Sequence, residues 1–211
     1  MKVLTGQAFF LWLIKTALLS VVCASVAFSD DDKDGIVTDR DGNAYRVVVI
    51  DNQTWMAQNL RVTHYTDSVS VESFVYDNDT ANAALYGRLY RSAAALGNPS
   101  GEVSDSARIQ GVCPCGWHVP SEAEWQQLVD YLGGDAAAGE KLRDGDFAAL
   151  PAGWFDFTGS FDGLGEVAFF LTAEVESKGG IKALQITNKG TSVKRVNLHP
   201  RDAISVRCVK D

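Results

Sequence analysis

The sequence predicts a single α+β domain, with short helices in the middle of the chain and strands toward both ends. One helix-like apolar stripe lies in residues 122–132, and the β-rich segments lie before and after the helical region. Strands and helices that are segregated in this way favour α+β over an alternating βαβ fold. The chain has 211 residues, 46% of them apolar and five of them Trp, which suffices for one well-packed core.

The N-terminal part of the domain is expected to form a β-hairpin. The folded domain is expected to begin near Ile36. Residues 44–50 are rich in β-branched side chains, a turn is predicted at Asp51-Asn52-Gln53, and residues 54–60 are expected to form a second short strand. Residues 77–82 are polar and are expected to form a loop.

The middle of the chain is expected to be helical. Residues 86–90 fit either a strand or a helix start, residues 91–96 have helical composition, and residues 97–106 are expected to form a loop. The strongest helix prediction is residues 122–132, because Ser121 and Glu124 have the spacing of a capping box. Its apolar stripe consists of Trp125, Leu128, Val129 and Leu132. Residues 136–143 are expected to form a second helix.

The C-terminal part is expected to be strand and loop. Residues 150–153 predict a turn, and residues 158–165 are glycine-rich. Strands are expected at residues 167–172, 183–187, 192–198 and 203–209. A last strand that pairs near the first one would bring the two ends of the domain together.

Residues 1–27 are expected to be a signal peptide. Lys2 gives a positive start, residues 8–28 are mostly apolar, and Ser25-Val26-Ala27 fits a small-residue cleavage site. An uncleaved membrane anchor is the alternative, although Lys15 would be costly within a membrane span. Cys23 is a candidate lipidation site. Either the leader or a Cys23 lipid would be the only expected membrane attachment.

Residues 28–35 are expected to be an acidic linker before the domain, which spans residues 36–211. The linker contains Asp30, Asp32 and Asp34, and Asp41 falls at the twelfth position of a calcium-loop frame. Asp rather than Glu at that position and the lack of flanking helices favour a solvated linker over a metal site. The net charge of −8 and the lack of a basic cluster argue against binding to nucleic acid or to anionic lipid.

Three cysteines follow the leader: Cys113, Cys115 and Cys208. The preferred disulfide joins Cys113 and Cys208, and it would close a loop of about 95 residues and stabilise the fold by roughly 4 kcal/mol. Cys115 is then expected to be a spare thiol. A bridge between Cys113 and Cys115 would be sterically awkward, and a metal site lacks the usual second ligand pair.

Eight short motifs resemble one bacterial family, the Fibrobacter succinogenes major paralogous domain family. In chain order they are DGNxY from Asp41, QTWMAQNL from Gln53, YGRLY from Tyr86, CPxGWHVP from Cys113, EW from Glu124, AGxKL from Ala138, ALPAG from Ala149 and SVRCV from Ser205. The resemblance implies an exported bacterial protein, often at the surface, with a fold similar to C-type lectins and formylglycine-generating enzymes. It implies no catalytic residues, because the family has no established activity.

The function expected is a binding or adhesion module that is secreted or lies on the outer-surface or periplasmic side of a bacterial envelope. Its ligand would be a protein or a glycan that binds to loops at residues 63–82, 97–107 and 154–166, with Trp154 as the candidate ligand contact. No catalytic, cofactor or metal motif is found. A formylglycine-generating-like oxidoreductase and a structural or display protein remain as alternatives.

Individual side chains are expected to be structural. Trp117 and Trp125 are expected in the core, and Arg207 is expected to be buried in an ion pair. His118 is expected to be a hydrogen-bonding residue rather than a catalytic base. The sequence lacks the Glu-Pro-Asn and Gln-Pro-Asp triplets of calcium-dependent lectins, so any sugar binding is expected to be independent of calcium.

Export of the full chain from a Gram-negative host tests the leader. We expect the intact mass of the exported protein to lack residues 1–27, because signal peptidase cleaves after a small residue such as Ala27. A mass increase equal to a diacylglycerol group on Cys23 would identify a lipoprotein instead. Retention of the whole leader would contradict both forms of processing.

Overall fold

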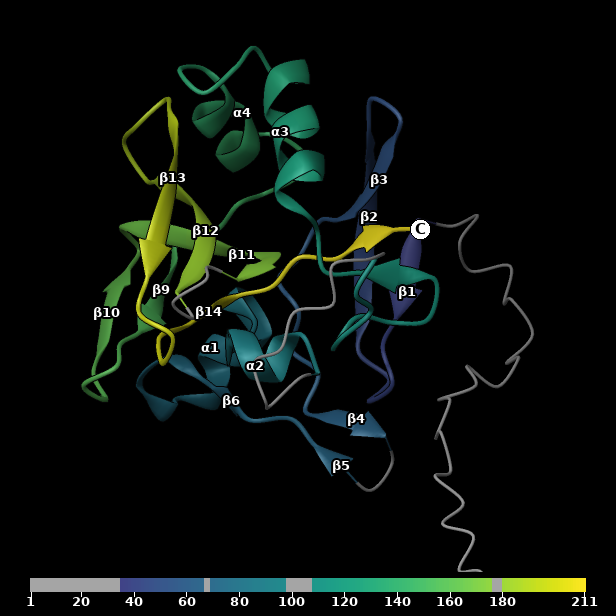
Figure 1. The fold of residues 1–211 in the computed structure, drawn as a ribbon, viewed down its shortest axis with the longest axis vertical. Coiled ribbons are helices and arrows are strands. Elements are labelled where there is room, and N and C mark those ends of the chain that lie inside the picture. The colour runs from purple at the N-terminus through teal and green to yellow at the C-terminus, as the bar shows by residue number, and fades with distance from the viewer. Residues whose placement is uncertain (1–34, 67–68, 98–107, 176–179) are drawn as a thin grey trace, which may run out of the picture.

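Figure 1 shows the fold of the protein in a computed structural model, which describes residues 35–66, 69–97, 108–175 and 180–211. A few short helices pack against many strands that are mostly antiparallel, an arrangement that agrees with the expected α+β class and equally with a mostly β fold. The expected signal peptide, Cys23 and nearly all of the acidic linker lie outside the described residues. None of the helices in the described ranges has the length and apolar character that a membrane crossing requires.

The larger sheet contains eight strands. Its order is β13-β12-β11-β9-β14-β7-β6, and β10 pairs with β9. Most of the pairs are antiparallel, but β11 runs parallel to β9 and to β14. The strands are β6 (Ser73–Phe74), β7 (Leu89–Arg91), β9 (Ala152–Phe155), β10 (Phe161–Leu164), β11 (Val167–Val175), β12 (Ile181–Thr187), β13 (Val193–Leu198) and β14 (Ala203–Ser205).

The smaller sheet has five strands in the order β1-β2-β3-β15-β8. These are β1 (Ile36–Thr38), β2 (Ala44–Ile50), β3 (Gln53–Met56), β8 (Trp117–His118) and β15 (Val209–Lys210). The predicted hairpin of β2 and β3 is confirmed, and the last strand, β15, pairs with β3 as expected. A separate ribbon joins β4 (His64–Thr66) to β5 (Val69–Ser70).

Four α-helices and a 3-10 helix connect the strands. They are η2 (Tyr76–Asn78), α1 (Thr80–Tyr86), α2 (Ser92–Ala95), α3 (Glu122–Tyr131) and α4 (Ala138–Asp144). The predicted capping box of α3 is present: the hydroxyl of Ser121 accepts from the Glu124 N–H at 3.2 Å, and Glu124 accepts from the Ser121 N–H at 2.9 Å. The apolar face of α3 is buried, as its periodicity predicts.

The structure differs from the sequence prediction at several places. Strand β9 begins at Ala152, inside the turn predicted at residues 150–153. Helix α1 forms where a polar loop was predicted, because Asp79 caps it by accepting the Ala81 N–H at 3.0 Å and the following residues favour helix. Strand β10 forms in the glycine-rich stretch 158–165, where it pairs with β9. The single strand predicted at 203–209 is divided into β14 and β15, which belong to different sheets.

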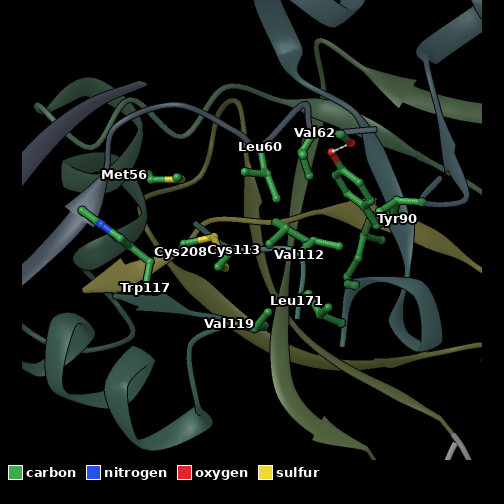
Figure 2. Packing of buried hydrophobic residues seen from close by; sticks show 14 of the residues in the cluster. Met56, Leu60, Val62, Tyr90, Val112, Cys113, Trp117, Val119, Leu171 and Cys208 are labelled. Atoms are coloured by element: carbon green, nitrogen blue, oxygen red, sulfur yellow. Dashed lines mark hydrogen bonds between the residues drawn. A yellow bond between two sulfur atoms is a disulfide. The ribbon is translucent and has the colours of Figure 1, made fainter. Parts of the chain in front are cut away.

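The predicted disulfide between Cys113 and Cys208 is present at the centre of one hydrophobic core, with a Cα–Cα distance of 5.9 Å. Figure 2 shows this bond among side chains from distant parts of the chain, including Met56, Leu60 and Val112. The expectation of a spare thiol at Cys115 is wrong, because no cysteine among the described residues is free.

A second core lies between α3 and the two sheets. Its centre is a group of four aromatic rings, Trp55, Trp125, Phe147 and Phe170, with centroids 4.6 to 5.9 Å apart. Trp125 is 1% exposed, and Trp117, in the core around the disulfide, is 2% exposed, so both predictions of a core position are confirmed. The aromatic rings fill the space that the short helices leave between the sheets.

The Arg207 guanidinium is buried between these cores. The side chain is 1% exposed and lies over the ring of Phe147, 4.5 Å from its centroid. Its Nε donates to the side-chain oxygen of Asn59 at 2.7 Å, and its terminal nitrogens donate to the carbonyls of Met56, Phe147 and Ala148 at 3.1, 2.5 and 2.8 Å. Burial, and to a smaller extent the charge of Arg46, lowers the pKa of Arg207 to about 9.

The ion pair expected for Arg207 is therefore wrong, although its burial is confirmed. Within the described residues the charge is solvated by carbonyl and amide oxygens rather than by a carboxylate. Ala148 has a positive φ of 50°, a region that alanine seldom adopts, and in that conformation its carbonyl accepts from Arg207. The buried cation thus holds the backbone of two separate segments, at Met56 and at Phe147–Ala148.

Replacing Arg207 tests this dependence. We expect Arg207→Met to lower the free energy of unfolding by about 3 kcal/mol or more, because it leaves several buried acceptors without a donor. Arg195→Met is the matched control, since Arg195 is partly exposed and its pair with Asp135 is at the surface. The control is expected to cost no more than about 1 kcal/mol. If urea unfolding gave the same loss of unfolding free energy for both variants, the fold would not depend on the buried hydrogen bonds of Arg207.

Candidate functional site

The feature best suited to binding is a group of half-buried aromatic side chains on the outer part of the larger sheet. We call it the aromatic surface. It is built on a small buried floor of Leu89, Ala152 and Ala203, which come from three neighbouring strands. Its members are Phe74, Tyr76, Tyr86, Phe155 and Phe161. Each of these rings packs against the floor while keeping part of its area exposed to solvent.

The rings of the aromatic surface contact one another in a chain. Phe74 and Phe155 are stacked, with centroids 4.2 Å apart and an interplanar angle of 20°. Phe155 lies 4.8 Å from Phe161, and Phe161 lies 5.2 Å from Tyr76. Such pairs hold each ring in place at little further entropic cost, so the surface is preorganised for a ligand.

Two glycines let the β9–β10 hairpin carry aromatic side chains close to its backbone. Gly153 has a φ of +65°, and a Cβ there would lie 2.8 Å from the ring of Tyr76 and 2.3 Å from the Asp162 carbonyl oxygen. Gly163 has a φ of +73°, and a Cβ there would lie 2.5 Å from the ring of Trp154. Both positions therefore require glycine, for conformation and for space.

Trp154, the candidate ligand contact, belongs to this hairpin but not to the aromatic surface. It is half-buried, packs over Gly163 and makes an edge-to-face contact with Phe169 at 5.2 Å. Only part of its indole can therefore meet a ligand. The neighbouring rings of Phe155 and Phe161 were not singled out from the sequence, because their pairing across β9 and β10 depends on a strand that was predicted as loop.

The turn of the hairpin is held by Asp156 and exposes one more aromatic side chain. The Asp156 carboxylate accepts from the N–H groups of Thr158 and Ser160 at 2.8 and 3.0 Å. The Thr158 hydroxyl donates to the same carboxylate, and these hydrogen bonds lower the pKa of Asp156. Phe157, at this turn, is 50% exposed, and its ring lies 4.5 Å from that of His199.

The structure brings together aromatic residues from two of the three segments that are expected to contact a ligand. Residues 63–82 supply Phe74 and Tyr76, and residues 154–166 supply Phe155, Phe157 and Phe161. In Figure 1 β6, from the first of these segments, lies on the side of the molecule that carries β9 and β10, whereas β4 and β5, from the same segment, lie apart from them. Of the third expected segment, 97–107, all but Gly97 lies outside the described residues.

Charged side chains flank the aromatic surface. Arg91 lies over the ring of Phe74, 5.1 Å from its centroid, and pairs with Glu72 at 2.8 Å. Arg88 donates to the hydroxyl of Ser73 at 2.8 Å. A partly exposed aromatic centre bordered by arginine and polar groups has the composition of a protein-binding surface, and aromatic rings also suit sugar faces.

A hollow of about 260 Å³ lies between α3 and the larger sheet. Trp125 and Leu184 line its inner part, and charged side chains line its opening. Those charges already have partners within the protein: Lys182 pairs with Glu122 and Arg195 pairs with Asp135, at 2.8 and 2.7 Å. A ligand would have to compete with these ion pairs, so the aromatic surface is the better candidate.

The three histidines lie in different parts of the structure. His64 lies beside Asp41, with 2.9 Å between Nδ1 and Oδ1, and Asp41 also accepts from the N–H and hydroxyl of Thr63. His118 is buried between two carboxylates, and His199 lies against Phe157. In the part of the chain that the structure describes, no cluster of three His, Cys, Asp or Glu side chains could hold a metal ion.

The candidate calcium loop stays a prediction. Asp30, Asp32 and Asp34 lie outside the described residues. Asp41, its fourth member, is described, and its two carboxylate oxygens accept hydrogen bonds from Thr63 and His64. These bonds outweigh the effect of burial and lower the pKa of Asp41.

Residues 48–210 match the family model of the Fibrobacter succinogenes major domain. The chain belongs to this family. The matched range begins within β2, ends within β15 and so includes the disulfide, Arg207 and the whole aromatic surface. No curated protein and no solved structure matches the chain.

Substitution of Gly153 tests how the family domain supports the aromatic surface. We expect Gly153→Ala to lower the free energy of unfolding by about 2 to 4 kcal/mol, because the methyl group meets backbone at a positive φ. Gly159→Ala is the matched control, since Gly159 also has a positive φ, of +95°, but open space around it. It is expected to cost about 1 kcal/mol. If thermal unfolding showed Gly159→Ala to be less stable than Gly153→Ala, this account of the hairpin would be contradicted.

Proposed function

We propose that this protein is an exported, surface-exposed binding module that contacts a protein or a glycan through the aromatic surface. The stacked, half-exposed rings of Phe74 and Phe155, supplied by two separate segments, carry the proposal. Aromatic side chains offer a large contact area at a low entropic cost, and here their positions are already fixed by packing. The leader predicted from the sequence supports export.

The arrangement favours binding over catalysis. The surface presents rings and ion pairs, and a reacting group would need a nucleophile beside a base. The alternative of a formylglycine-generating-like oxidoreductase would require a reactive thiol, whereas Cys113 and Cys208 are joined to each other in a buried bond. The alternative of a display protein without a ligand leaves the ordered, exposed rings without a role.

A C-type-lectin-like fold is part of the proposal. It is supported by the pairing of β15 with β3, which brings the two ends of the domain together. It is also supported by the long connections between the two sheets and by the disulfide that fixes the C-terminal segment. In such a scaffold the sheets provide rigidity and the connections provide specificity.

Two exposed side chains next in the chain to members of this surface provide the test: Phe157 lies in the turn between β9 and β10, and Leu85 precedes Tyr86 on α1. Phe157 and Leu85 are 50% and 60% exposed, so replacing each by alanine should leave the fold intact and weaken binding at least about tenfold if each contributes 1.4 kcal/mol or more. The wild type is screened on a glycan array, and against envelope proteins of the producing cell, before the variants are measured on the hits. Any glycan binding is expected to persist in EDTA.

Tyr131→Ala is the matched control. Tyr131 is 59% exposed and lies at the end of α3, which Figure 1 shows far from β6 and β10. The control should bind as the wild type does. Binding that the Phe157 and Leu85 variants retain in full, or glycan binding lost in EDTA, would contradict the proposed surface or its expected independence of calcium.

A further inference from the structure

His118, on β8, is a buried titratable group that the proposed binding surface does not use. The side chain is 1% exposed, and each ring nitrogen faces a carboxylate. Nδ1 lies 2.7 Å from Asp211 Oδ1, and Nε2 lies 2.8 Å from Glu124 Oε1. Ionised carboxylates only accept hydrogen bonds, so both contacts are made together only when the imidazole carries two protons.

The two carboxylates are held very differently. Glu124, on α3, also accepts from the N–H and the hydroxyl of Ser121, at 2.9 and 2.8 Å, and its side chain is 23% exposed. The Asp211 side chain is 47% exposed, and its only side-chain partner among the described residues is His118. The Asp211 N–H donates to the Gly116 carbonyl at 3.0 Å, at the end of β15.

We propose that His118 is a proton-dependent latch, which holds Asp211 and the end of β15 against β8 when the ring is protonated and releases them when it is not. A neutral ring has a single N–H. Glu124 is fixed by the capping box, so the remaining proton stays on Nε2. Nδ1 then presents a lone pair to Asp211 Oδ1, which turns an attraction into a repulsion. Asp211 is half exposed and free to turn toward water.

The charges around the ring determine the pH range of the latch. The groups that face it are the carboxylates of Glu124, from α3, and Asp211, from beyond β15. Burial disfavours the charged ring, but the hydrogen bonds to these carboxylates outweigh burial and raise the pKa of His118 above its ordinary value of 6.5. A raised pKa means that the stabilisation is complete below about pH 6.5 and is lost as the pH rises through the folded value.

At the acid end, the latch is limited by the pH at which Glu124 becomes protonated. Burial opposes the charged form of Glu124, but hydrogen bonds to His118 and Ser121 lower its pKa from 4.5 to about 2. The stabilisation by Glu124 is therefore complete above about pH 4.5 and is lost as the pH falls toward 2. The latch is closed in mildly acidic solution, where Glu124 is ionised and His118 is protonated, and it opens as the pH rises through the raised pKa of His118.

Nuclear magnetic resonance of the full mature chain tests the latch. We expect the His118 ring signals to titrate with a midpoint above pH 6.5, and the protection of the Asp211 amide against hydrogen exchange to fall with the same midpoint. Asp211→Asn should lower the His118 midpoint by about one pH unit, because it removes one of the two facing charges. His64 is an internal control, since it is 41% exposed and faces the carboxylate of Asp41, far along the chain from Asp211.

The outcomes separate a latch from a purely structural histidine. In His118→Gln, which cannot gain a proton, the Asp211 amide should have a protection factor that no longer changes near the wild-type midpoint. An Asp211 amide whose protection is constant through the His118 titration would overturn the proposal. So would a His118 midpoint that Asp211→Asn leaves unchanged. If either variant fails to fold, the two titrations in the wild type still decide the question.

Discussion

A single buried cation, Arg207, determines how the rest of the molecule is arranged. A guanidinium removed from water must find an acceptor for nearly every N–H, and here the acceptors come from two segments far apart in the chain. The connection after β3 supplies Asn59 and the Met56 carbonyl, and the segment after α4 supplies Phe147 and Ala148. The two sheets and the aromatic core between them are thereby fixed relative to one another.

The C-terminal segment combines this constraint with two others. Within a few residues it contributes β14 to the larger sheet, Arg207 to the core, Cys208 to the disulfide and β15 to the smaller sheet. Unfolding would have to break all of these contacts, so the segment is a rigid centre for the fold. The same scaffold holds β9 between β11 and β14 in the larger sheet, and β10 pairs with β9 to place Phe155 and Phe161 beside each other.

Much of the fold could be predicted from the sequence, where the signal is local. Helix α3 follows from the spacing of Ser121 and Glu124 and from its apolar stripe, and the β2–β3 hairpin follows from β-branched residues around a turn. The pairing of Cys113 with Cys208 followed from elimination among few cysteines. Each of these signals lies within a short window or in a small set of residues, so no knowledge of the remaining chain is needed to read it.

The sequence by itself thus indicated short helices among many strands, the family, the main helix and the preferred disulfide. The tertiary structure decided the partners of Arg207, the division of residues 203–209 between two sheets and the existence of the aromatic surface. Phe74, Tyr76, Tyr86, Phe155 and Phe161 come from five elements, and no local pattern links them. Their meeting depends on which strands pair across long stretches of chain, and that choice is made by the packing of the whole domain and not by any one segment.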